Sequence, residues 1–265
     1  MIVRSGPGGG KSEPAQTPFM NAKDVASIEQ ATLAAVAPET VEEREGWLLP
    51  VDHGTIGRAR SAVPLLHTDT DPGVLGRIEA YYAARGLPAV FRLATAAIFD
   101  DLRDELRQRG YRADKPTLVQ LGTLARMREV SSQPPAEIAT APDAAWTALF
   151  LGEGFDPVDG ACRVRSLSRA QGSVYASVRG GGQVLAGGVA AFGHGWVSVH
   201  GMRTAAGHRG QGLAGRVLAG LADAALARGM ARVFLQVEAG NAAAQALYRR
   251  AGFGTAWTYE YWRRA

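Results

Sequence analysis

The run Arg209-Gly210-Gln211-Gly212-Leu213-Ala214 has the residue types of a phosphate-binding turn. It follows a strand-like segment, and apolar residues at helical spacing begin at its end. The first turn of a helix offers unpaired backbone N–H groups and the positive end of the helix dipole, which attract anions. Glycine lets the backbone approach phosphate oxygens because it lacks a Cβ atom. An ordinary strand-to-helix turn has the same composition, so the surroundings of the run must decide.

A dinucleotide-binding site is a second interpretation of this run. Gly210, Gly212 and Gly215 satisfy the G-x-G-x-x-G pattern of Rossmann oxidoreductases. That pattern also requires an acidic residue about 20 residues further on. Glu238 could be assigned to this role only loosely, because it lies further away than that. The loop alone therefore leaves both interpretations open.

The elements that would position this loop alternate along the second half of the chain. Apolar spacing and capping residues predict helices over residues 143–150, 157–169, 212–228 and 241–251. Strand patterns cover residues 174–178, 184–191, 196–202, 233–237 and 255–262. The loop would thus connect the strand that ends near Met202 with a long helix.

A second motif lies about 30 residues beyond the loop, with Asn241, Ala244, Leu247, Tyr248 and Gly252-Phe253 in order. The two motifs at this separation resemble the GNAT superfamily of N-acetyltransferases, whose signature R/Q-x-x-G-x-G/A opens a long helix. The resemblance covers residues 131–265. It implies an α/β fold with a mixed sheet and the transfer of an acetyl group from acetyl-CoA to a primary amine.

The resemblance also implies where acetyl-CoA binds. The strand that ends near Met202 and the strand over residues 233–237 would splay apart and admit the pantetheine arm. That arm would pair with the main chain of the segment Met202-Arg203-Thr204. Arg209 and the backbone amides of Gly210, Gln211, Gly212, Leu213 and Ala214 would hold the pyrophosphate. Asn241 and Ala244 would border the cofactor, although Asn241 is equally suited to cap the following helix.

The same resemblance suggests proton-transfer roles. Tyr248 would protonate the departing thiolate, since a phenol keeps its proton at neutral pH; the alternative is a core aromatic residue. The base is open between His200, whose ordinary pKa suits the task, and Glu238 at the end of its strand. Holding the amine against the thioester could also suffice without a dedicated base. An acyl-CoA-sensing module without catalysis is the alternative function.

The acceptor is a small-molecule or peptide amine whose identity the sequence leaves open. Glu153, Asp156 and Asp159 lie in the loop that covers the acceptor in the family. Clustered acids would favour a cationic amine, whereas the structural interpretation is a solvated loop in which Asp156 caps a helix at Pro157.

The first half resembles a degenerate copy of the second. Ala84-Arg85-Gly86 and Val90-Phe91 recur 143 residues later as Ala227-Arg228-Gly229 and Val233-Phe234. At this offset the phosphate loop falls on residues 66–71, which contain two acids and no glycine, and Tyr248 falls on Leu106 after a one-residue slip. We therefore expect one acyl-CoA site, with a first half that shapes the acceptor cleft or supports a homodimer. Trp47, Arg58 and Arg60 are candidates for that cleft, with a role in the fold as the equal alternative.

The elements predicted for the first half follow the same alternation. Helical spacing covers residues 25–36, 71–85 and 100–109, and strand patterns cover residues 47–51, 55–63, 89–93 and 117–124. The expected organisation is a disordered segment over residues 1–22, a degenerate GNAT-like domain over residues 23–130 and a catalytic domain over residues 131–265. Within the first segment, Gly6 to Ser12 imitates a phosphate loop but lacks its first glycine.

Composition limits the classes of site, partner and location that this protein can have. The only cysteine, Cys162, excludes an internal disulfide and a cysteine-cluster metal site, and we expect no metal. Residues 131–265 contain 13 arginines and no lysine against eight acids. This basic charge favours a phosphate-bearing cofactor over nucleic acid, because the arginines are scattered rather than arranged in a stripe. No apolar run reaches 18 residues and no secretion signal is evident, so we expect a cytoplasmic protein without a membrane partner.

Overall fold

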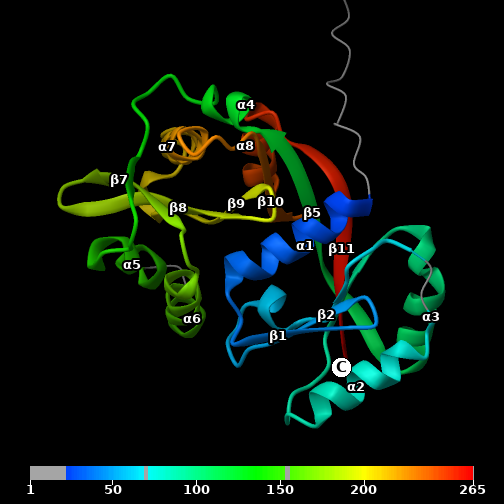
Figure 1. The fold of residues 1–265 in the computed structure, drawn as a ribbon. Helices are drawn as coiled ribbons and strands as arrows, with labels where there is room; N and C mark the ends of the chain where they lie inside the picture. Colours follow the sequence, from blue (N-terminus) through cyan, green and yellow to red (C-terminus); the bar gives the residue numbers. More distant parts are fainter. Residues whose placement is uncertain (1–21, 69–70, 153–155, 265) are drawn as a thin grey trace, which may run out of the picture.

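The computed structural model describes residues 22–68, 71–152 and 156–264 (Figure 1). The segment expected to be disordered, with its phosphate-loop-like run, therefore lies outside the described residues except for Ala22. Two sheets form: a small one with the strand order β1-β2-β3, and an eight-stranded mixed one with the order β4-β11-β5-β10-β9-β8-β7-β6. The predicted mixed α/β fold is confirmed, and a Rossmann sheet is excluded because only the β9–β10 pair of the large sheet is parallel.

The elements of the first half are α1 (Ala22–Val36), β1 (Thr40–Arg44), β2 (Trp47–Val51), η1 (Gly57–Arg60), β3 (Val63–Pro64), α2 (Val74–Ala83), β4 (Phe91–Ala94), η2 (Ala97–Phe99), α3 (Asp100–Gln108), β5 (Tyr111–Thr123) and α4 (Leu124–Arg128). Those of the second half are β6 (Glu137–Ala139), α5 (Ala144–Leu151), α6 (Pro157–Arg169), β7 (Val174–Gly180), β8 (Gln183–Gly193), β9 (Trp196–Thr204), η3 (Ala206–His208), α7 (Leu213–Leu226), β10 (Arg232–Glu238), α8 (Ala242–Arg250) and β11 (Gly254–Arg264).

Helices cover both faces of the large sheet. In Figure 1, α7 and α8 lie on one face, whereas α1, α5 and α6 lie on the other. The side chains of Asp143 and Asp156 cap α5 and α6 by accepting hydrogen bonds from backbone N–H groups three residues on, at 2.8 and 2.7 Å. The helix α7 buries Val217, Leu218 and Leu221 against β7, β8 and β9. This packing fixes the end of α7 at which the glycine-rich loop lies.

The two halves exchange strands across the middle of the large sheet. β4 and β10 are counterparts in the repeat, as are β5 and β11. When each strand of the order β4-β11-β5-β10 is replaced by its counterpart, the same order results, read from the opposite end. Each half thus places its last strand beside the other half's penultimate strand. A parallel bridge between Ala62 and Phe91 matches the parallel pair of Ser198 and Phe234 in the second half. This two-fold relationship supports a tandem duplication; the boundary expected at residue 131 stays a prediction.

Glycines at helix ends repeat with the same backbone geometry. Gly86 and Gly229 have φ of +67° and +69°, and Gly110 and Gly252 both have φ of +84°. Each follows the end of a helix, where a left-handed residue satisfies the last carbonyl groups and only glycine does so without steric cost. The sequence offset thus reflects equivalent turns in three dimensions.

One strand of the first half was predicted wrongly. Residues 55–63 form the 3₁₀ turn η1 followed by the two-residue strand β3. The guanidinium of Arg60 donates a hydrogen bond to the carbonyl oxygen of Gly54 at 3.1 Å, and Ala59 N–H donates to Ile56 at 3.0 Å. These local bonds close the turn, which buries Ala59 against α1 and β2 and leaves Arg58 on the side of the large sheet.

Candidate active site

The strands β9 and β10 pair over only three residues before they diverge. Val197 to Val199 pair in parallel with Val233 to Leu235, and no pairing continues beyond them. The cause lies in β9: two residue steps along β8, from Val189 to Gly187, face three residue steps along β9, from His200 to Arg203. This β-bulge contains Gly201 at φ of +61° and turns the end of β9 away. The expected divergence of β9 and β10 is present. Gly201, a single glycine within a strand pattern, could have indicated the bulge from the sequence.

A cavity of about 320 Å³ occupies the divergence. From the face that carries α7 and α8 it is lined by Asn241, Ala244 and Tyr248. From the opposite face it is lined by η1, Phe150 of α5 and Arg163 of α6. The diverging strand ends contribute residues 199–203 and 236–238. The cavity therefore passes between the strands and is accessible to groups from both faces of the sheet.

The glycine-rich loop lies at the start of α7. Gly210 and Gly212 have φ of +77° and +79°, and Gly212 occupies the N-cap position in the left-handed conformation. Within the described part of the chain, the backbone N–H groups of residues 210–214 donate no hydrogen bond. Arg209, Gln211 and both glycines are exposed. The loop thus presents a row of free donors at a helix N-terminus, the arrangement that binds a phosphate group.

Tyr248 points into the cavity from α8. Its side chain is buried, its ring meets Phe253 edge-to-face at 6.0 Å, and burial raises its pKa to about 12. The hydroxyl group is therefore a proton donor throughout the neutral range. Asn241 also lines the cavity, but its Oδ1 accepts a hydrogen bond from Ala244 N–H at 3.1 Å. The helix-cap function expected for Asn241 is thus present in the structure.

His200 and Glu238 line the same cavity at the ends of β9 and β10. The Nδ1 atom of His200 lies 3.2 Å from the carbonyl oxygen of Ser198, while Nε2 is buried with no hydrogen-bond partner among the described residues. Burial, with a smaller contribution from the charge of Arg58, lowers the pKa of His200 to about 4. The imidazole is thus neutral at pH 7, and Nε2 is free to accept a hydrogen bond. Glu238 is exposed at the cavity rim.

The comparisons with known proteins agree with this geometry. A family model described as "Probable histone acetyltransferase Rv0428c C-terminal" matches residues 22–262. The chain belongs to this family, and its fold is that of GNAT acetyltransferases. No similar sequence was found among curated proteins.

Solved structures show the same fold. A GCN5-related N-acetyltransferase from Kribbella flavida is 18% identical, with a TM-score of 0.67 over 91% of this chain and 95% of the other. A tandem GNAT protein from the clavulanic acid biosynthesis pathway is 12% identical, with a TM-score of 0.58 over 90% and 94%. A putative GNAT acetyltransferase from Novosphingobium aromaticivorans is 18% identical, with a TM-score of 0.55 over 90% and 99%. The tandem arrangement of this acetyltransferase therefore has a structural precedent.

Because His200 of the acetyltransferase is buried, we expect its unfolding free energy to depend on pH. The folded-state pKa of His200, about 4, lies below its ordinary 6.5, so the unfolded state binds more protons between these values. The contribution of His200 to the unfolding free energy is then fully present above pH 6.5 and declines as the pH falls toward 4. We expect His200→Gln to remove about 2–3 kcal/mol of the difference in unfolding free energy between pH 7 and pH 4, measured by urea titration. The control His194→Asn, at an exposed site, should keep the full difference in unfolding free energy between pH 7 and pH 4. If both variants show the same dependence of the unfolding free energy on pH, His200 is not its source.

Of the three first-half residues expected to line the acceptor cleft, one borders this cavity. Arg58 lines it, and its Nη1 donates to the Oε1 atom of Gln236 at 3.1 Å. Trp47 is buried in the core of the first half and borders a different cavity. Arg60 is held by the turn described above. Arg58 and Arg60 face different ways because the assumed strand over residues 55–63 contains a turn. Trp47 lies in the predicted strand β2 and has a role in the fold.

The two described acids of the acidic loop, Asp156 and Asp159, have partners within the protein. Asp156 caps α6, and Asp159 accepts hydrogen bonds from Thr55 Oγ1 at 2.7 Å and from Arg163 Nε at 2.6 Å. These partners hold the pKa of Asp159 below its ordinary value, against the raising effect of burial. Glu153 lies outside the described residues. The described acids of this loop thus act in capping and in pairing.

Several residues that line the cavity were not predicted from the sequence. They come from elements that are distant in the chain, and nothing in their local pattern marks them. They are Lys115 and Thr117 of β5, Arg163 of α6, Gln236 of β10, and Tyr259, Tyr261 and Arg263 of β11. Only the strand exchange brings β5 and β11 together at this point.

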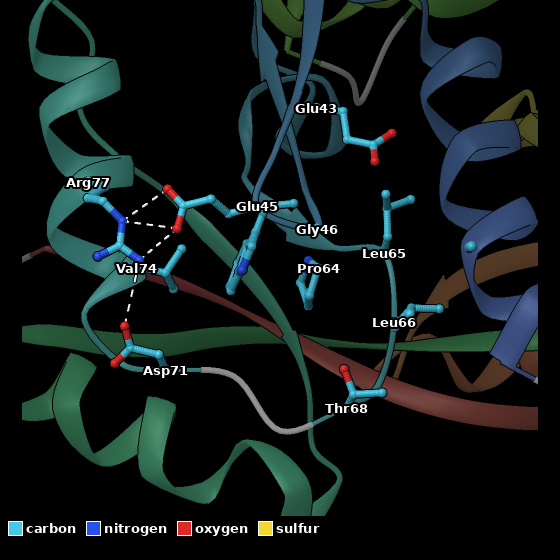
Figure 2. A pocket seen from close by; sticks show the side chains of 12 residues that line it. Glu43, Glu45, Gly46, Pro64, Leu65, Leu66, Thr68, Asp71, Val74 and Arg77 are labelled. Carbon is cyan, nitrogen blue, oxygen red and sulfur yellow. Dashed lines mark hydrogen bonds and ion pairs between the residues drawn. The ribbon is translucent and has the colours of Figure 1, made fainter.

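A second cavity, of about 490 Å³, lies in the first half (Figure 2). It is bordered by Glu43, Glu45 and Asp71, and Arg77 bridges Glu45 and Asp71 at 2.6 and 3.6 Å. Leu66, Thr68 and Asp71, which belong to the counterpart of the phosphate loop, line this cavity. A phosphate group there would meet three carboxylates against one arginine, so the residues present do not suit acyl-CoA. The described residues also contain no cluster suited to a metal ion, and no described helix has the length and hydropathy needed to cross a bilayer.

Proposed function

We propose that this acetyltransferase transfers the acetyl group of acetyl-CoA to a primary amine, with both substrates bound together. The observation that carries the proposal is the cavity between the diverging strands, which Tyr248 lines from the face that carries α7 and its phosphate loop, and which has a separate approach from the opposite face. Two substrates that enter from opposite faces can react with each other directly, without an acetyl-enzyme intermediate. This arrangement gains its rate chiefly from holding the amine against the thioester.

The chain's own residues fit the parts of acetyl-CoA. The free N–H groups of residues 210–214 and the Arg209 guanidinium would bind the pyrophosphate. The edge of β9 from Met202 through Arg203 to Thr204, released from β10 by the bulge, offers main-chain donors and acceptors to the pantetheine arm. Gly212 suits this role because its φ of +79° strains any other residue. When bound, acetyl-CoA supplies an activated acetyl group as a thioester.

The side chains account for the proton balance. The amine nitrogen forms a bond to the acetyl carbon, the carbon–sulfur bond breaks, and the nitrogen loses a proton. Tyr248 gives its hydroxyl proton to the sulfur atom of CoA. Glu238, at the water-exposed rim, takes the amine proton directly or through one water molecule. His200 accepts a hydrogen bond from the amine at Nε2 and thereby orients the nitrogen lone pair; its depressed pKa makes it a positioning group rather than a strong base.

Calorimetric titration of acetyl-CoA tests the cofactor half of the proposal. We expect micromolar binding to the parent and about ten-fold weaker binding to Arg209→Ala, because one charge-assisted phosphate contact is lost. Arg249→Ala is the control, since Arg249 is exposed on α8 outside the cavity. Binding to the parent should precede CoA-thiol release on addition of an amine. A parent protein that binds neither acetyl-CoA nor CoA would refute the proposal.

A further inference from the structure

The side of the cavity that faces the acceptor is strongly cationic. Among the described residues that line the cavity, one carboxylate, that of Glu238, stands against five basic side chains; these are Arg58, Lys115, Arg163, Arg203 and Arg263. A site for a lysine side chain or another purely cationic amine would be expected to show the opposite balance. The charge therefore carries information about what the acceptor bears in addition to its amine.

Existing ion pairs neutralise only part of this charge. Arg163 pairs with Asp159 and Arg263 with Asp114. Among the described residues, no carboxylate lies within ion-pair distance of Arg58 or Lys115. The partner of Arg58 is the neutral amide of Gln236. A net positive charge thus persists beside the neutral imidazole of His200.

Two of the arginines lie close to each other. The Arg203 guanidinium lies 4.9 Å from the ring centre of Phe150, and burial together with the nearby charge of Arg163 lowers its pKa. Asp159 lies near both groups. Two neighbouring guanidinium groups suit a ligand carboxylate, because each can donate charge-assisted hydrogen bonds to it.

The position of these cations assigns them to the acceptor rather than to the phosphates of CoA. Arg58 on η1 and Arg163 on α6 approach from the face opposite α7, at whose start the phosphate loop lies (Figure 1). The loop of residues 209–214 does not border this cavity. A CoA molecule held by that loop would leave Arg58 and Arg163 for a different anionic group.

We infer that the acceptor is a small primary amine that also carries a carboxylate, as an amino acid does. The inference rests on the proposed function. The carboxylate binds Arg58 and the Arg163–Arg203 pair, which places the amine nitrogen toward Nε2 of His200 and the carboxylate of Glu238. A lysine-rich protein tail, which the description of the family model would suggest, meets like charges on entering the same space.

A matched panel of acceptors tests the inference with the full chain. The twenty L-amino acids, their amides and the corresponding decarboxylated amines are compared with a lysine-rich histone-tail peptide by CoA-thiol release. For the best amino acid we expect kcat/KM at least ten-fold above its amide and above the peptide. Higher kcat/KM for the amide, the decarboxylated amine or the peptide would overturn the inference and leave the proposed function intact. Failure to bind acetyl-CoA in calorimetry would instead overturn the proposed function itself.

Variants locate the carboxylate site. For Arg58→Gln and Arg163→Gln we expect the amino-acid to amide ratio of kcat/KM to fall about ten-fold, with acetyl-CoA affinity unchanged. Arg165→Gln is the control, because Arg165 is exposed on the same helix as Arg163 and does not border the cavity. The ratio is measured within one protein preparation, so a partly destabilised variant still reports it. An unchanged ratio in both cavity variants would overturn the assignment.

Discussion

Tyr248→Phe is expected to lower kcat about 100-fold while the affinity for acetyl-CoA stays within a factor of about two. The phenyl ring keeps the edge contact with Phe253 and fills the same volume, so the change removes only the proton donor. CoA-thiol release with the best acceptor measures kcat, and calorimetry measures binding. The parent should keep its activity well into the alkaline range, because burial raises the pKa of Tyr248 to about 12.

The control for this prediction is another buried tyrosine. Tyr175 donates its hydroxyl to the carbonyl oxygen of Leu167 at 2.7 Å and does not border the cavity. Tyr175→Phe should cost about 1 kcal/mol of stability and leave kcat unchanged. If Tyr248→Phe retains more than half of the parent kcat, water protonates the thiolate and Tyr248 has only a packing role.

The second large effect concerns a buried ion pair between α1 and β4. Arg92 Nη1 lies 2.7 Å from Glu29 Oε2, with side-chain exposures of 0% and 2%, and the guanidinium lies 5.0 Å from the ring centre of Tyr259. Burial raises the pKa of Glu29, and Arg92 opposes that shift. Arg92→Met leaves a buried carboxylate without its partner, so we expect a loss of about 3–5 kcal/mol in the unfolding free energy at pH 7.

A double variant separates the charge from the packing. Glu29→Met with Arg92→Met removes both charges and fills a similar volume, so its loss in urea unfolding should be smaller than that of Arg92→Met alone. The loss in the single variant should also shrink at low pH, where Glu29 can take up a proton. If the double variant is as unstable as the single one, the pair matters for its shape rather than for its charge.

The sequence was most informative where structure is determined locally. The helix over residues 157–169 begins at Pro157 and is capped by Asp156, as its first residues predicted. The loop of residues 209–214 and the helix that carries Tyr248 also fall where the two motifs place them. In each case the cap, the glycine and the apolar spacing lie within a few residues of one another, so neighbouring side chains suffice to define the element.

Predictions failed where distant pairing decides. Nothing within residues 111–123 indicates that they insert between β10 and β11, because strand partners are chosen by contacts far apart in the chain. The turn of residues 57–60 likewise depends on α1 and β2 beneath it. The basic character of the acceptor side could not be foreseen, since Lys115, Arg163 and Arg263 become neighbours only through that exchange.

The interleaving of β5 and β11 makes the two repeats physically inseparable. A polypeptide with the second repeat alone would expose the edges of β10 and β11 that β5 now covers, and such bare edges invite aggregation. The first repeat has acids where its phosphate loop would be, yet its strand β5 is needed to cover both edges. Under the proposed function, changes at Arg58 or Lys115 of this repeat would alter acceptor preference without touching the residues proposed to hold acetyl-CoA.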